Sequence, residues 1–255
     1  MSFWPLRRRS APRPDFGALP PPQPERLAYV VGDVHGCLGK LTRLLEIIDT
    51  DRAGREADLV FVGDYVDRGD DSAGVMELLH GLQASMPDTV HCLLGNHDQM
   101  LLEFLDDPMK GLRWLGLGGE ETLVSYGIGN PRSGGLEERL TSRSQALARA
   151  MGADTVAWLR ARPLWWRSGT LVAVHALTDP GLAMEAQRPE VLLWARPPRE
   201  LHPREDGAWV VHGHTIHDEP LVRAGHVAID TGAFRGGPLT AAVFSGAAPR
   251  YLASD

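Results

Sequence analysis

The stretch ADLVFVGDYVDRG (residues 57–69) joins an apolar segment to a turn that carries two carboxylates and a guanidinium. The apolar part is typical of a buried strand. Asp64, Asp67 and Arg68 follow it directly, between two glycines. An ordinary turn needs no more than a pair such as Asp-Gly. We therefore expect this turn to face a strongly positive ligand and, beside it, a negatively charged one.

The same pattern recurs at the ends of two neighbouring predicted strands. GDVHG (32–36) follows one apolar segment, and GNHD (95–98) follows another. In an α/β sheet the ends of adjacent strands share an edge, and ligands bind there. Together with histidines after two later strands, the three clusters supply the candidate ligands Asp33, His35, Asp64, Asn96, His97, His175, His212 and His214.

The order of the predicted elements indicates an α/β fold. Apolar residues recur at helical spacing in residues 38–49 and 73–84, between the first three strands. Residues 98–162 look mostly helical, and several short strands follow them. We predict one domain over residues 26–255, with two mixed β-sheets flanked by helices and a helical cap insertion at residues 98–162.

Composition narrows the classes of function. The net charge of −7 argues against a general affinity for nucleic acid, and no apolar run approaches the roughly 18 residues of a membrane span. Two cysteines, Cys37 and Cys92, make no disulfide framework and favour a reducing, cytoplasmic compartment. Residues 1–25 are rich in proline and arginine, lack the apolar stretch of a secretion signal, and are interpreted as a flexible tail.

The candidate ligands suit transition metals. Carboxylate and amide oxygens mixed with imidazoles favour Mn²⁺, with Fe or Zn²⁺ as alternatives, whereas Ca²⁺ and Mg²⁺ prefer oxygen alone. The set is too large for one ion, and a shared carboxylate would explain an acid at its centre. Two divalent ions roughly 3.5–4 Å apart clamp a phosphoryl group for displacement and make hydroxide from water near neutral pH.

Five motifs in order carry a resemblance to a known family. GDVHG, GDYVDRG and GNHD, followed by VHA (174–176) and GHT (213–215), resemble the signatures of the phosphoprotein phosphatases in the calcineurin-like metallophosphoesterase fold. HALTDPGLAMEAQ (175–187) and IDTGAFRGGPLTA (229–241) resemble its bacterial and phage branch of serine/threonine protein phosphatases. The resemblance covers residues 28 to about 244.

The resemblance implies a role for each residue. His212 and His214 would face the same side of an extended strand, so only the family's GHT selects His214. His97 would protonate the leaving oxygen, oriented by Asp67, and Arg68 and Arg196 would clamp the phosphate. The implied metal ligands are Asp33 and His35 for one ion, Asp64 as the bridge, and Asn96, His175 and His214 for the other.

Two activities on this fold compete. The first is a metal-dependent phosphomonoesterase that hydrolyses phosphorylated protein or peptide by attack of a hydroxide between the metals. The second is a dinucleoside polyphosphate hydrolase, acting for example on diadenosine tetraphosphate. Asp67 favours the first, because symmetrically cleaving tetraphosphatases typically lack that acid, while Asp98 leans towards the second. Within residues 98–162, GGEETLVSYG (118–127) has no basic side chain, and a clamp of only Arg68 and Arg196 also favours a substrate with one phosphoryl group.

Three further interpretations fit single motifs. Asp33 and Asp64 would pass as ordinary turn acids, but two matched glycine-flanked acids and a third cluster argue against this. Residues 37–43 fit the Cys-x5-Arg signature of tyrosine phosphatases, yet leucines at helical spacing mark a helix there, not a phosphate loop. A metal-stabilised binding module would close its site with strong ligands, whereas this set includes the neutral Asn96.

Overall fold

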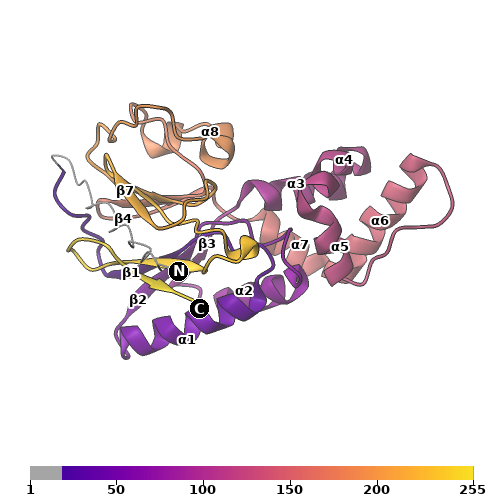
Figure 1. Cartoon of the computed structure of the whole chain (residues 1–255), viewed down its shortest axis with the longest axis horizontal. Coiled ribbons are helices and arrows are strands. Elements are labelled where there is room, and N and C mark those ends of the chain that lie inside the picture. Colours follow the sequence, from indigo (N-terminus) through magenta and orange to yellow (C-terminus); the bar gives the residue numbers. More distant parts are fainter. Residues whose placement is uncertain (1–18, 255) are drawn as a thin grey trace, which may run out of the picture.

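The computed structural model of the protein describes residues 19–254 and contains two five-stranded sheets (Figure 1). The first sheet has the order β10-β9-β1-β2-β3, with β1, β2 and β3 parallel and β9 and β10 antiparallel to their neighbours. This sheet therefore contains both parallel and antiparallel pairs, as predicted for a mixed β-sheet. The strands are β1 Leu27–Val31, β2 Ala57–Phe61, β3 Val90–Cys92, β9 Thr240–Phe244 and β10 Arg250–Ala253.

The second sheet is also mixed and has the order β4-β5-β6-β8-β7. Its three central strands β5, β6 and β8 are parallel, and both edge strands are antiparallel. A parallel centre directs several strand ends to one edge, as a ligand site requires. The strands are β4 Trp165–Ser168, β5 Leu171–Val174, β6 Trp209–His212, β7 Leu221–Arg223 and β8 His226–Ala228.

The two sheets pack face to face through a shared apolar layer. Val30 and Val60 of the first sheet belong to the same buried cluster as Val211 and Val227 of the second. Side chains alternate along each strand, so Tyr29 faces the opposite side of the first sheet, where it belongs to the cluster shared with the helices. The helices that cover the outer faces are α1 Leu38–Arg52, α2 Ser72–Ser85 and α8 Pro189–Trp194.

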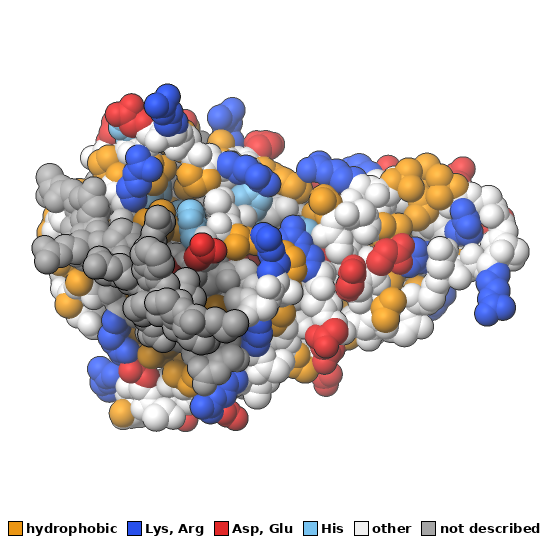
Figure 2. Space-filling model, viewed as in Figure 1, with side chains coloured by type: hydrophobic (Ala, Val, Ile, Leu, Met, Phe, Trp, Pro, Cys, Tyr) orange, Lys and Arg blue, Asp and Glu red, His pale blue; other side chains and the backbone are white. Residues whose placement is uncertain are grey.

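A helical lobe, residues 96–160, projects from one end of the sandwich (Figure 1). It contains most of the predicted cap insertion. A π-helical turn at Leu115–Gly119 includes Gly118 with a φ of 120°, so the chain bends sharply there. Histidine side chains reach the surface between the sandwich and this lobe (Figure 2). The helices of the lobe are α3 Asn96–Asp106, α4 Gly111–Trp114, α5 Glu120–Ser125, α6 Leu136–Met151 and α7 Ala153–Arg160.

Most of the predicted tail, residues 1–18, lies outside the described residues. Its described part runs along the second sheet: the carbonyl of Pro20 accepts a hydrogen bond from Trp209, and the amide of Gln23 donates to Thr170 (both 2.8 Å). None of the helices in residues 19–254 combines the length and apolarity needed to cross a membrane.

Candidate active site

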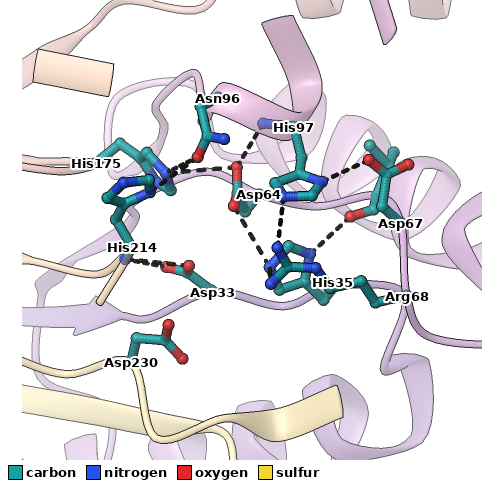
Figure 3. A network of polar contacts seen from close by, with 12 residues as sticks. Asp33, His35, Asp64, Asp67, Arg68, Asn96, His97, His175, His214 and Asp230 are labelled. Atoms are coloured by element: carbon teal, nitrogen blue, oxygen red, sulfur yellow. Dashed lines mark hydrogen bonds and ion pairs between the residues drawn. The ribbon is translucent and has the colours of Figure 1, made fainter. Parts of the chain in front are cut away.

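Side chains from the turns after β1, β2 and β3 lie together (Figure 3), and the first two turns bind each other through their backbones. The amides of Val34 and His35 donate to the carbonyl of Asp64 at 3.1 and 2.8 Å, and Gly36 donates to Tyr65 at 2.9 Å. Three turns that the sequence places about 30 residues apart therefore form a single edge, as predicted from the strand ends.

The Asp98 carboxylate fastens the second turn to the third. It accepts hydrogen bonds from the amides of Asp64 (2.8 Å), Tyr65 (3.0 Å) and Gly95 (2.9 Å). The backbones approach so closely that a Cβ on Gly95 would lie 2.1 Å from the Asp64 nitrogen. Any other residue at position 95 would push the two turns apart, because real Cβ contacts are never so short.

Backbone strain is concentrated in these turns. Seven non-glycine residues between 19 and 254 have a positive φ, and five of them belong to the candidate site. Such conformations cost free energy and persist only where the surroundings enforce them. Here they aim neighbouring polar side chains at one point. The five are His35 (44°), Asp64 (52°), Asp67 (75°), Arg68 (70°) and His214 (63°).

The two carboxylate oxygens of Asp64 face different histidines. Oδ2 lies 3.4 Å from Nε2 of His35, and Oδ1 lies 3.5 Å from Nε2 of His175. Each of these side chains is buried. Potential ligand atoms group within 4.8 Å in two sets that share Asp64, one with His35 and His97, the other with Asp33 and His175. Asp33 falls in the set with His175, and the pairing of Asp33 with His35 on one ion, which the resemblance implies, stays a prediction.

The histidine nitrogens are prepared to bind a cation. Nδ1 of His35 donates to the carbonyl of Val66 (2.9 Å), and Nδ1 of His175 donates to that of Val62 (3.1 Å). Burial lowers the pKa of both rings, to about 3 for His35. Each ring is thus neutral and turns an unprotonated Nε2 towards Asp64, the arrangement typical of metal-bound histidine.

Asn96 and His214 complete the second group. The Asn96 Oδ1 lies 2.7 Å from Nε2 of His175 and 3.0 Å from Nδ1 of His214. Nε2 of His214 is buried and has no partner among residues 19–254. A buried polar nitrogen without a partner is costly. Oxygen and nitrogen acceptors that converge in this way fit a divalent cation.

Buried negative charge supports the same conclusion. Burial raises the pKa of Asp33, and the charges of Asp230 and Asp64 raise it further. Burial also raises the pKa of Asp230, to about 6. Three carboxyls thus share a buried site, and cations would remove both the repulsion between them and part of the cost of burial.

His97 lies between Asp67 and Arg68. Its Nδ1 is 2.6 Å from Asp67 Oδ2, and its Nε2 is 2.8 Å from an Arg68 nitrogen. Burial acts to lower the pKa of His97, but the charge of Asp64 and the hydrogen bond to Asp67 more than offset it, so the pKa is raised. This ring can carry a proton near neutral pH, as proton transfer requires.

Residues of the helical lobe donate hydrogen bonds to Asp67. These contacts were not predicted from the sequence. Trp114 Nε1 donates to Asp67 Oδ2 (2.8 Å), and the hydroxyl of Thr122 donates to Oδ1 (2.7 Å). The backbone nitrogen of Arg68 donates to the Gly118 carbonyl (3.2 Å). The only sequence signal for these contacts was the glycine-rich break at residues 116–119, which marks where the lobe turns towards the site.

The two predicted phosphate-binding arginines differ in their surroundings. Arg68 also contacts His35 Nε2 (3.1 Å), and its Cζ lies 4.6 Å from the centre of the Phe234 ring. Arg196 is exposed, and after burial and the charge of His175 its charge helps to lower the pKa of His214 to about 4. Arg68 therefore lies within the candidate site, and Arg196 acts on that site through its charge.

Two residues from the alternative interpretations lie outside the ligand set. His212 is buried, and its Nδ1 contacts the carbonyl of Gly213 (3.1 Å) rather than the Asp64 cluster. Cys37 precedes helix α1, so residues 38–43 form no phosphate-binding loop. Burial raises the pKa of the Cys37 thiol, which disfavours the nucleophilic thiolate.

Comparison with known proteins identifies the fold. The family described as calcineurin-like phosphoesterase matches residues 28–218. A candidate diadenosine tetraphosphatase of known structure is 22% identical, covers 94% of this chain and 99% of its own, and has a TM-score of 0.61. A cold-active protein-tyrosine phosphatase from a Shewanella species is 19% identical over 92% of this chain and 83% of its own, with a TM-score of 0.58. The predicted calcineurin-like fold is confirmed.

Sequence relatives share one name. The protein "Bis(5'-nucleosyl)-tetraphosphatase, symmetrical" from Legionella pneumophila (strain Corby) is 45% identical over 85 residues, 32% of this chain and 29% of its own length. A protein of the same name from Methylococcus capsulatus is 32% identical over 152 residues, 60% of this chain and 43% of its own length. The aligned part of the chain thus spans less than half of each relative.

The Asp98 bonds predict a loss of stability on mutation. Asp98→Ala leaves three buried amides without an acceptor, and each costs about 1–3 kcal/mol. Asp98→Asn keeps one acceptor oxygen and should lose less. Urea denaturation of both variants measures the free energy of unfolding, with the exposed Asp70→Ala as control. An Asp98→Ala protein as stable as the control would contradict the role of this carboxylate.

The shared position of Asp64 predicts the metal content of variants. Asp64→Asn should weaken binding of both ions, because each of its oxygens faces a different ligand group. His214→Ala should weaken one. Metal analysis after dialysis against Mn²⁺ tests this, and His212→Gln, a buried histidine outside the ligand set, is the matched control. Two ions retained by Asp64→Asn would refute the bridging arrangement.

Proposed function

The chain belongs to the calcineurin-like phosphoesterase family, and from that premise we propose that it hydrolyses dinucleoside polyphosphates such as diadenosine tetraphosphate. The observation that carries this proposal is the position of Asp64, whose two oxygens face His35 and His175 at 3.4 and 3.5 Å. A carboxylate shared in this way suits a two-cation site for displacement at phosphorus. The shared name of two sequence relatives supports the choice of substrate.

The expected action on phosphorylated protein or peptide is wrong. Relatives named as symmetrical tetraphosphatases, from Legionella and Methylococcus, overturn it. The sequence argument relied on Asp67, but in the structure this acid is buried and bound to Trp114, Thr122 and His97. Asp67 therefore orients other residues of the site, and its presence does not distinguish a phosphoprotein from a dinucleoside polyphosphate.

The ligand groups fit two divalent cations. We expect Mn²⁺, with Fe or Zn²⁺ as alternatives, because oxygen and imidazole ligands occur together. When bound, the cations would supply a nucleophile from water and neutralise charge on the phosphoryl oxygens. The residues that would hold them are Asp33, His35, Asp64, Asn96, His175 and His214.

His97 and Arg68 act on the substrate in this proposal. The guanidinium of Arg68 donates hydrogen bonds to phosphoryl oxygens, for which its fork geometry is suited. When Arg68 turns from His97 Nε2 to the phosphate, that nitrogen gives a proton to the leaving oxygen, and Asp67 stabilises the protonated ring beforehand through its 2.6 Å contact with Nδ1. Arg196 adds a positive charge on the His214 side of the site.

The proposal predicts which substrate is hydrolysed faster. At saturating Mn²⁺ we expect kcat/KM for diadenosine tetraphosphate to exceed that for any member of a phosphopeptide panel by about tenfold or more, a difference of roughly 1.4 kcal/mol. Chromatography should show ADP as the sole nucleotide product of symmetrical cleavage. A chelator should abolish turnover, and added Mn²⁺ should restore it. Faster hydrolysis of a phosphopeptide would overturn the proposal.

A further inference from the structure

Three arginines at the candidate site have no acceptor within the described chain. Arg113, Arg196 and Arg235 make neither a hydrogen bond nor an ion pair through their side chains with residues 19–254, whereas Arg160 and Arg250 pair with carboxylates. Exposed arginines far from the site are also unpaired, so the lack of an acceptor does not by itself identify an arginine that binds a ligand. Arg113 and Arg235 differ from these because residues next to them, Trp194 and Phe234, contact the elements of the candidate site.

Arg113 stacks on a tryptophan that is bound to α3, the helix that begins at Asn96. Its Cζ lies 4.6 Å from the centre of the Trp194 ring, and Trp194 Nε1 donates to Gln99 Oε1 (2.9 Å). Gln99 lies one helical turn beyond Asn96 on α3, and Trp194 precedes Arg196 by two residues. Stacking on an indole leaves the N–H groups at the edge of a guanidinium available to a ligand.

Arg235 follows a residue, Phe234, that packs on the other side of Asp64. It ends the short helix Ala233–Arg235, directly after Phe234. The Phe234 ring lies 4.6 Å from Arg68 Cζ and 5.1 Å from the centre of the His35 ring. In Figure 3, His35 and Arg68 lie on one side of Asp64, and Asn96, His175 and His214 lie on the other. Arg113 is thus linked to the Asn96 side through Trp194 and Gln99, and Arg235 to the His35 side through Phe234.

We propose that Arg113 and Arg235 bind the phosphates on the two sides of the scissile linkage and so select a polyphosphate chain over a single phosphoryl group. The inference rests on the proposed function. Metal ligands and Arg68 account for the reacting group, and the remaining phosphates need further positive charge. Arg113 acts with Arg196 near His214, while Arg235 acts near His35.

The inference revises the sequence-based estimate of positive charge. From the sequence, a clamp of only Arg68 and Arg196 disfavours a polyphosphate. In the structure, Arg113 of the lobe stacks on Trp194 of helix α8, and Arg235 follows Phe234 in a distant segment of the chain. The number of arginines in one segment of the sequence does not show which of them come together in the folded chain.

Inhibition by inorganic phosphates tests the proposal without requiring turnover of a dinucleotide. Hydrolysis of p-nitrophenyl phosphate is measured at fixed free Mn²⁺, with tripolyphosphate or orthophosphate as inhibitor. Wild type should bind tripolyphosphate more tightly. Arg113→Ala and Arg235→Ala should each reduce that preference by about tenfold, roughly 1.4 kcal/mol, because each variant loses a charge-assisted hydrogen bond to phosphate. Arg113→Lys should fall between Arg113→Ala and wild type, because it keeps the charge but loses the fork.

The exposed Arg149→Ala, on helix α6, is the matched control and should keep the wild-type preference. An unchanged preference in both Arg113→Ala and Arg235→Ala, or a wild type that binds the two inhibitors equally, overturns this inference. A wild type that prefers tripolyphosphate but fails to cleave diadenosine tetraphosphate overturns the proposed substrate instead. The two failures are therefore separate.

Discussion

A single carboxylate, that of Asp98, sets the geometry on which the candidate centre depends. By accepting the amides of Asp64, Tyr65 and Gly95 it holds the turn after β2 against the turn after β3. Burial and the charge of Asp64 raise the pKa of Asp98 to about 8. Cations at Asp64 would offset the second cause, so metal binding and the rigidity of these turns support each other.

The site draws on both parts of the molecule. The sandwich supplies the metal-ligand candidates from its strand ends, while the helical lobe supplies Trp114 and Thr122 to Asp67 and brings Arg113 to Trp194. The residues that would bind metal are thus fixed by the sheets. The positions of Trp114 and Thr122, which bind Asp67, and of Arg113 depend instead on how the lobe is attached to the sandwich.

The sequence predicted the parts of this arrangement that follow from short-range pattern. Glycine-flanked polar clusters after apolar segments located Asp33, Asp64 and Asn96, because parallel strand ends must share an edge. It could not find Trp114 or Arg113, because their partners Asp67 and Trp194 are 47 and 81 residues away and no periodicity links them. The motifs specify the residues that act on one phosphorus atom, and these are shared across the family. They therefore could not distinguish the substrate classes, and the predicted class was wrong.

The bonds from the lobe to Asp67 also restrict how the molecule can move. Swinging α4 and α5 away from the sandwich would strip a buried carboxylate of the Trp114 and Thr122 donors, and each lost donor costs about 1–3 kcal/mol. It would also break the bond between Arg68 and Gly118, which supports a residue in the left-handed region. The lobe is therefore a fixed wall of the candidate site and not a hinged lid, so a ligand must reach the site without any opening of the lobe.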